Sequence, residues 1–141
     1  MLQLKLFLLE DRLAICRLMA GDTIPEWASS GGRFCSVTRT AGELSIICAE
    51  NAVPPGVPCE RAWRIFQIAG PLDFAATGIL VSAARPLAEA GVPIFAISTF
   101  DTDYVLIKQE HAENAVRALE SAGHRVARCE SLAEHEGNGS R

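Results

Sequence analysis

A strand–turn–strand pattern occurs twice in this chain, and it constrains the fold more than any other feature. The first copy is FCSVTRTAGELSIICAE at residues 34–50, and the second is FAISTFDTDYVLIKQE at residues 95–110. After one additional turn residue in the first copy, Glu43 corresponds to Asp103. Each copy has β-branched and apolar residues on both sides of a polar turn, which is the pattern of a β-hairpin. The repeat predicts two related structural units.

The segments around the second hairpin predict a complete βαββαβ unit. A strand is expected at residues 63–69 and a helix at about 77–90, where apolar residues recur at helical spacing. Pro86 lies inside this helix and should kink it or restart it. A second helix is expected at about 110–122, followed by a closing strand at 124–128. This order of elements is a ferredoxin-like α+β unit.

The segments around the first hairpin predict a reduced copy of the same unit. An opening strand is expected at residues 13–19, and a further strand at 3–9 could precede it. Residues 25–30 leave room for only one or two helical turns. Units of about sixty residues are marginally stable alone, so the two should share a core. The sequence predicts a first unit at residues 1–61, a second unit at 62–128 and a disordered tail at 129–141.

A continuous apolar run in the second hairpin bears on self-association. Val105, Leu106 and Ile107 are apolar in succession, whereas a half-buried antiparallel strand alternates polar and apolar residues. Either the other unit or another chain should therefore cover the second face of this sheet. We expect a homodimer, most simply a two-fold one.

Charge and apolar runs argue against nucleic acid and membrane as partners. The 141 residues carry a net charge of −4 and contain no block of lysine and arginine, which counterion release from nucleic acid requires. RNA-binding ferredoxin-like domains also need aromatic and basic residues on the central strands, whereas residues 103–107 are acidic and then mostly aliphatic. No apolar run approaches the ~20 residues of a membrane span, and the N-terminus lacks the pattern of a secretory signal. A cytoplasmic location is expected.

The residues that could support chemistry do not form a catalytic or metal-binding pattern. The five cysteines are widely spaced and contain no CxxC pair, and the three histidines do not lie at ligand spacing from them. Ser98 and Thr99 with His124 would form a nucleophile pair, but neither an acidic third member nor a G-x-S-x-G motif supports it. We therefore expect no cofactor, no metal and no enzymatic activity.

Three segments carry a resemblance to a known family. They are GPLDFAATGIL at residues 70–80, PLAEAGVPIFAISTFDTDYVLI at 86–107 and SAGH at 121–124. Together with the order of elements, they resemble the small bacterial proteins made of tandem ACT domains. The STF-x-x-D pattern is similar to that of a eukaryotic cytosolic arginine sensor built from ACT domains. The resemblance implies a non-catalytic regulatory protein that binds an amino acid at an interface between ACT units.

The resemblance also implies the positions of the ligand-binding residues. They lie in the first strand-to-helix loop and in the hairpin: Thr77, Gly78, Ile79, Thr99, Phe100 and Asp103. Backbone N–H groups at a helix start can bind a carboxylate. Asp103 offers a negative partner for an ammonium group or a basic side chain.

Ordinary structural roles compete with these assignments. Thr77 and Gly78 could simply begin a helix, and both Asp101 and Asp103 are common turn residues. We assign Asp101 to the turn. Phe74 could form a wall of the cleft, but we favour a place in the core. The alternative function is a protein–protein adaptor with a vestigial pocket, which would bind an unknown partner through the sheet face around residues 105–107 or through an edge strand.

Overall fold

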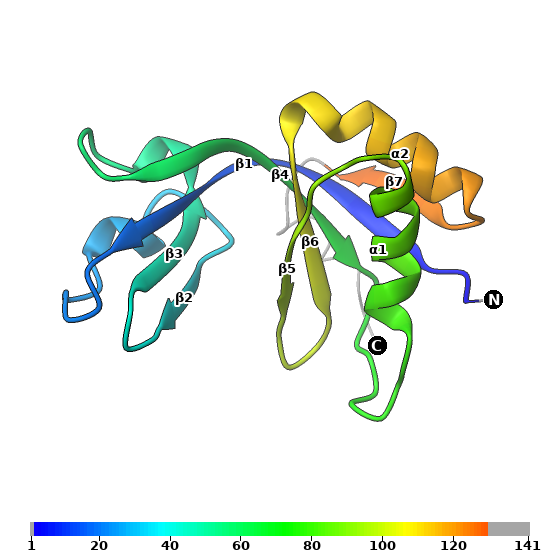
Figure 1. The fold of residues 1–141 in the computed structure, drawn as a ribbon, viewed down its shortest axis with the longest axis horizontal. Coiled ribbons are helices and arrows are strands. Elements are labelled where there is room, and N and C mark those ends of the chain that lie inside the picture. Colours follow the sequence, from blue (N-terminus) through cyan, green and yellow to red (C-terminus); the bar gives the residue numbers. More distant parts are fainter. Residues whose placement is uncertain (1, 130–141) are drawn as a thin grey trace. The chain divides into compact units, whose positions relative to one another are not determined.

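A computed structural model describes residues 2–129 of the chain. Its elements are seven strands, three short 3-10 helices and two α-helices (Figure 1). In chain order they are β1 (Lys5–Leu18), η1 (Glu26–Ser29), β2 (Ser36–Arg39), β3 (Leu44–Ala49), η2 (Glu50–Ala52), β4 (Cys59–Ile68), α1 (Ile79–Glu89), β5 (Phe95–Ser98), β6 (Asp103–Lys108), η3 (Gln109–His111), α2 (Ala112–Ser121) and β7 (Arg125–Cys129). Both predicted hairpins are present, because β2 pairs with β3 and β5 pairs with β6, each antiparallel.

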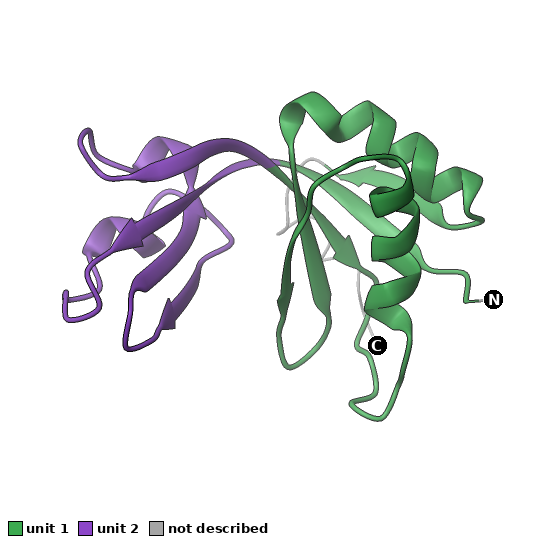
Figure 2. Cartoon of the chain, in the orientation of Figure 1, with its two compact units in different colours: residues 1–10, 64–129 green, residues 11–63, 130–141 purple. Residues whose placement is uncertain are grey.

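The described residues divide into two compact units (Figure 2). Unit 1 contains residues 1–10 and 64–129, and unit 2 contains residues 11–63. Both long strands cross this division, so β1 and β4 each contribute one half to either unit. The boundary predicted between residues 61 and 62 lies close to the point within β4, between residues 63 and 64, where the chain passes from unit 2 to unit 1. The prediction grouped residues 1–10 with the first hairpin, whereas the structure places the N-terminal half of β1 with the second. The predicted tail falls outside the described residues except for Cys129, which ends β7.

Unit 1 is a ferredoxin-like βαββαβ unit with one additional strand. Its strands follow the order β7, β1, β4, β6 and β5, so the N-terminal half of β1 lies between the last and the first strands of the repeat. This insertion makes one parallel pair, in which Lys5 is opposite Arg125 and Leu9 is opposite Cys129. The two strands predicted at residues 3–9 and 13–19 are therefore one continuous strand that serves both units.

One face of the sheet in unit 1 forms the core with α1 and α2. The face presents alternate residues such as Phe66 and Ile68 of β4 and Val105 and Ile107 of β6. The helices bury residues at spacings of three and four, the period of an amphipathic helix. These helical residues are Ala83 and Leu87 of α1 and Ala112, Ala115, Val116 and Leu119 of α2. The core of unit 1 is thus aliphatic around one fully buried aromatic ring, that of Phe66.

Helix α1 continues through Pro86 as a single element instead of restarting there. Proline has no N–H, so it leaves the carbonyl oxygen of Ser82 without its usual helical donor. The ring of His124 replaces that donor, because its Nε2 lies 2.8 Å from the Ser82 oxygen. The other ring nitrogen, Nδ1, accepts a bond of 3.0 Å from the backbone N–H of Leu4. His124 is 6% exposed, and its ring joins α1 to the segment that leads into β1.

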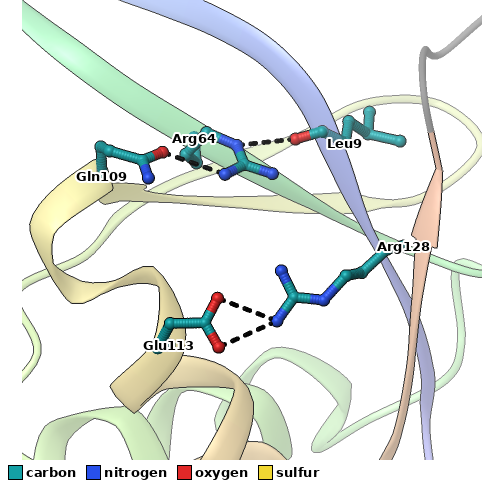
Figure 3. Close-up of polar contacts among 5 residues, drawn as sticks. All are labelled: Leu9, Arg64, Gln109, Glu113 and Arg128. Atoms are coloured by element: carbon teal, nitrogen blue, oxygen red, sulfur yellow. Dashed lines mark hydrogen bonds and ion pairs between the residues drawn. The ribbon is translucent and has the colours of Figure 1, made fainter.

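Two arginines of unit 1, Arg64 and Arg128, differ in burial and in the role of their contacts (Figure 3). The partly buried Arg64 donates from Nε to the Leu9 carbonyl and from a terminal nitrogen to Gln109 Oε1, both at 2.9 Å. The exposed Arg128 pairs with the Glu113 carboxylate at 3.0 Å and 3.1 Å. Arg64 therefore ties β1, β4 and η3 together, whereas an exposed pair such as Arg128–Glu113 adds little stability.

Unit 2 is the reduced copy that the sequence predicts. Its strands follow the order β2, β3, β1 and β4, and its only helical segments are η1 and η2. The residue pairs of β1 and β3 run from Leu13 opposite Ala49 to Leu18 opposite Leu44. Its core contains Ala14, Cys16, Ala28, Leu44, Ile46, Cys48 and Val53.

The apolar run of β6 is buried on both faces within the single chain. Val105, Leu106 and Ile107 all have an exposed fraction of zero. The prediction that this run is covered is confirmed, but its burial in one chain removes it as an argument for a second copy. For the same reason it does not supply an exposed sheet face for an adaptor. No helix in the described part of the chain is long and apolar enough to cross a membrane.

Candidate functional site

The start of helix α1 carries two of the predicted ligand-binding residues. Gly78 precedes the helix with φ of 77° and ψ of 1°, a left-handed conformation that glycine adopts without strain. No side chain caps this helix start. The first N–H groups of a helix have no partner within the helix, so those of the first turn are available to an acceptor. They also lie at the positive end of the helix dipole.

Three more of the predicted ligand-binding residues, Thr99, Phe100 and Asp103, lie in and beside the turn of the second hairpin. The Thr99 N–H donates to the Thr102 carbonyl at 2.9 Å, which closes the turn. The Ser98 hydroxyl donates to Asp103 Oδ1 at 2.6 Å. The Asp103 carboxylate is therefore oriented by a neighbour on the paired strand, and its second oxygen offers further acceptor capacity.

Two hydrogen bonds hold this turn beside the loop that follows β4. The buried Thr102 hydroxyl donates to the Ile68 carbonyl at 2.6 Å, and the Leu72 N–H donates to the Asp101 carbonyl at 2.7 Å. The approach is so close that a Cβ on Gly70 would lie 3.0 Å from the Thr102 Cβ. Asp101 thus contributes to the turn through its backbone oxygen, and a side chain at position 70 would be crowded against the turn.

These segments enclose a pocket of about 350 Å³ in unit 1. Among the predicted site residues, Gly78, Ile79, Thr99, Phe100 and Asp103 line it together, whereas Thr77 is not a lining residue. The sequence reasoning missed several other lining residues, which are Leu72, Asp73, Ala76, Leu80, Val81, Ser98 and Thr102. Their spacing carries no ligand motif, and only the contact between loop and turn places them here.

Two exposed phenylalanines form the rim of the pocket. Phe74 is 74% exposed and Phe100 is 79% exposed. Their rings meet edge to face, with centroids 4.9 Å apart. Our preference for a core position of Phe74 is therefore wrong. A residue in a long loop can be apolar without being buried, and the loop sequence alone has no periodicity that would reveal this.

The charges of the pocket favour a ligand with a cationic group. Asp73, Asp101 and Asp103 line it, and no lysine, arginine or histidine does so among the described residues. The uncapped helix start provides the opposite polarity at one side. An anion alone would be repelled by the three carboxylates, whereas a ligand with both an anionic and a cationic end matches both sides.

The arrangement does not support nucleophilic chemistry at Ser98 or at a buried thiol. The Ser98 hydroxyl donates to Asp103, and both ring nitrogens of His124 are bonded to backbone groups of Leu4 and Ser82. The Cys16 thiol is buried in unit 2, and burial, together with nearby Cys48 and Cys59, raises its pKa to about 12. No group of three potential ligand residues is placed to hold a metal ion within residues 2–129.

The thiols should differ sharply in reactivity. Because the thiolate is the nucleophile, a buried thiol whose pKa is about 12 stays protonated at pH 8. We expect a disulfide reagent such as DTNB to label the exposed Cys35 in the folded protein, and to label Cys16 and Cys48 only after denaturation. Peptide mapping of the labelled chain makes this measurement. Rapid labelling of Cys16 in the native state would contradict the buried position.

Comparison with known proteins identifies the class of protein. The family model of the ACT domain matches residues 59–121, and a second family model, described as an N-terminal domain, matches residues 11–56. A crystal structure of an Agobacterium tumefaciens protein is 39% identical, covers 92% of this chain and 96% of its own, and superposes with a TM-score of 0.85. Residues 59–121 of the chain therefore belong to the ACT-domain family.

Two further proteins of described role are similar to this chain. The chain is similar to the cytosolic arginine sensor for mTORC1 subunit 1 of Bos taurus, with 36% identity in an alignment 110 positions long that covers 68% of this chain and 33% of the sensor. The chain thus spans about a third of that relative. The ligand-free regulatory subunit of aspartate kinase from Thermus thermophilus shares the fold, with 17% identity and a TM-score of 0.57 over 80% of this chain and 93% of that subunit.

Proposed function

We propose that this protein is a non-catalytic regulatory protein that binds an amino acid in the pocket of unit 1. The observation that carries the proposal is that an uncapped helix start and three aspartates line one pocket. The ligand carboxylate would accept bonds from the backbone N–H groups of the first turn of α1. Its ammonium group, or a basic side chain, would face Asp103. The similarity to an arginine sensor and to a kinase regulatory subunit supports a regulatory role.

We further propose that an ACT unit of a second copy completes the site. Phe74 and Phe100 leave apolar surface exposed at the rim of the pocket, and an approaching unit would remove it from water. Light scattering on the protein with and without a stabilising amino acid tests this step. A monomer under both conditions would mean that the pocket works within one copy.

The first experiment is a thermal melt of the protein with each common amino acid. A ligand that binds only the native state stabilises it by mass action, by about 2.7 kcal/mol when its concentration is 100 times Kd. We expect selective stabilisation by one amino acid or by a small group with related side chains. If no amino acid raises the melting temperature, the adaptor hypothesis becomes the better one, with the exposed phenylalanines as its contact surface.

The second experiment distinguishes the two acids of the hairpin turn. Asp103→Asn removes the charge with almost no change in shape, and loss of a charge-assisted bond of about 1.5–3 kcal/mol should weaken binding roughly ten- to a hundredfold. Asp101→Asn is the matched control, because Asp101 holds the turn through its backbone oxygen. Calorimetry on both variants gives the answer. Loss of affinity in Asp101→Asn alone would reverse our assignment, and loss in neither would move the site elsewhere.

A further inference from the structure

Three cysteine side chains meet in the core of unit 2, on three neighbouring strands. Cys48 lies on β3, Cys16 on β1 and Cys59 at the start of β4. Cys16 and Cys48 belong to the core of this unit, and Cys59 packs against that core. Burial first, and then contact and hydrogen bonding with the other two thiols, raise the pKa of Cys16 to about 12. The three side chains are thiols, with no disulfide among them.

The backbone register places Cys16 directly opposite Cys59. The Arg17 N–H donates to the Pro58 carbonyl at 3.0 Å, so these two residues form a hydrogen-bonded pair between the antiparallel strands β1 and β4. Cys16 and Cys59 are the next pair, which is non-hydrogen-bonded and has both side chains on the same face. The Cα atoms of such a pair are roughly 4.5 Å apart, and a disulfide needs a Cα separation of about 4.4–6.8 Å.

The other two pairings of these cysteines do not meet this requirement. Cys48 is opposite Ala14 and Cys16 is opposite Ile46, so Cys16 and Cys48 are diagonal neighbours. Diagonal neighbours are about 7–8 Å apart, which a disulfide spans only if the backbone moves. Cys48 and Cys59 lie on strands separated by β1, at about twice the strand spacing of roughly 4.8 Å. Of the three pairs, Cys16 and Cys59 are therefore the one placed to form a disulfide.

Cys59 is the thiol of this cluster that a reagent reaches first. Cys16 and Cys48 have exposed fractions of 1% and zero, whereas Cys59 is half-buried and directly follows the loop at residues 53–58. Cys16 is too buried to react first, but its position against Cys59 allows a second, intramolecular step. Holding two reacting groups together gives effective molarities that reach the order of 10⁵ M, which offsets the low thiolate fraction of Cys16.

We propose that Cys16 and Cys59 are a site of reversible oxidation, at which a low-molecular-weight disulfide converts the two thiols into a disulfide between β1 and β4. The Cys59 thiolate attacks one sulfur of the small disulfide, and a first small thiol leaves. Cys16 then gives its proton to water, and its sulfur attacks the Cys59 sulfur and releases the second small thiol. Two electrons thus pass from the protein to the small disulfide, which is reduced to two thiols.

This site shares no residue with the pocket of unit 1, so the proposal is independent of the function proposed above. Both strands that the disulfide would join continue into unit 1. Oxidation would therefore fix, within unit 2, the two strands that serve both units.

Mass spectrometry of the folded full chain after incubation with oxidised glutathione tests the proposal. A background of Cys35→Ser and Cys129→Ser removes the two thiols outside the cluster, which would take up glutathione by themselves. We expect the chain to lose the mass of two hydrogen atoms, and peptide mapping to find Cys16 bonded to Cys59. Dithiothreitol should restore the original mass. A lasting mixed disulfide of glutathione, no reaction, or a disulfide from Cys16 to Cys48 would each overturn the proposal.

Matched variants in the same background identify the two partners. Cys48→Ala should keep the disulfide, whereas Cys59→Ala should abolish it, and thermal melts check that both remain folded. Oxidation in denaturing urea is the reference without the fold. There, Cys48 and Cys59 should join several-fold more often than Cys16 and Cys59, because the shorter loop closes at a lower entropy cost. The same distribution of disulfides in the native protein and in urea would overturn the proposal.

Discussion

Replacing Phe66 with alanine should lower the free energy of unfolding by about 3–5 kcal/mol. Phe66 lies on β4 with an exposed fraction of zero, and it packs in the core of unit 1 between the sheet and both helices. The substitution removes the apolar contact area of the ring and leaves a cavity that the surrounding strands can fill only in part. Urea unfolding followed by circular dichroism measures the change. A loss of this size is a large share of the total stability of a small domain.

The matched control is Phe100→Ala in the same unit. The Phe100 side chain is 79% exposed and contacts the ring of Phe74, so its removal should cost less than about 1 kcal/mol. The chemistry of the two substitutions is identical, and only the burial of the ring differs. Equal destabilisation by both would mean that Phe100 is covered in solution, for example by a second copy.

Replacing His124 with phenylalanine should cost about 2–4 kcal/mol of folding stability. The ring accepts the Leu4 N–H and lies 2.8 Å from the Ser82 oxygen, which Pro86 leaves without a helical donor. Phenylalanine keeps a planar ring of similar size but has no polar atoms. The buried Leu4 N–H and the part-buried Ser82 carbonyl then lose their partner, which costs about 1–3 kcal/mol for the buried group and less for the other.

Hydrogen exchange of the Leu4 amide gives a local readout beside the unfolding curve. In His124→Phe this amide should exchange much faster than in the parent, because its acceptor is gone. The control is His111→Phe, since His111 is half-buried and its ring lies 3.9 Å from Glu110. That variant should stay within about 0.5 kcal/mol of the parent. If the Leu4 amide exchanges as slowly in His124→Phe as in the parent, the His124 ring is not the acceptor that protects this amide.

Local pattern predicted the elements of both units well. The two hairpins, α1, α2 and β7 lie within a few residues of their predicted positions, because apolar periodicity and turn residues act over a few neighbours. The resemblance of the loop and hairpin segments pointed to five residues that line the pocket of unit 1, and their role in ligand binding stays a prediction. It did not predict Asp73 or Ser98, whose positions depend on the contact between a loop and a turn.

The sequence by itself determined which segments are strands and helices, and which faces of α1, α2 and β6 are apolar. Only the tertiary structure decided that β1 is one strand shared by both units, with its first half parallel to β7. It also decided that His124 completes the hydrogen bonding of a helix interrupted by Pro86. The physical reason is the same for both. The sequence shows that an apolar face must be buried and that an unpaired carbonyl must find a donor. Which distant segment supplies the partner depends on how the whole chain packs.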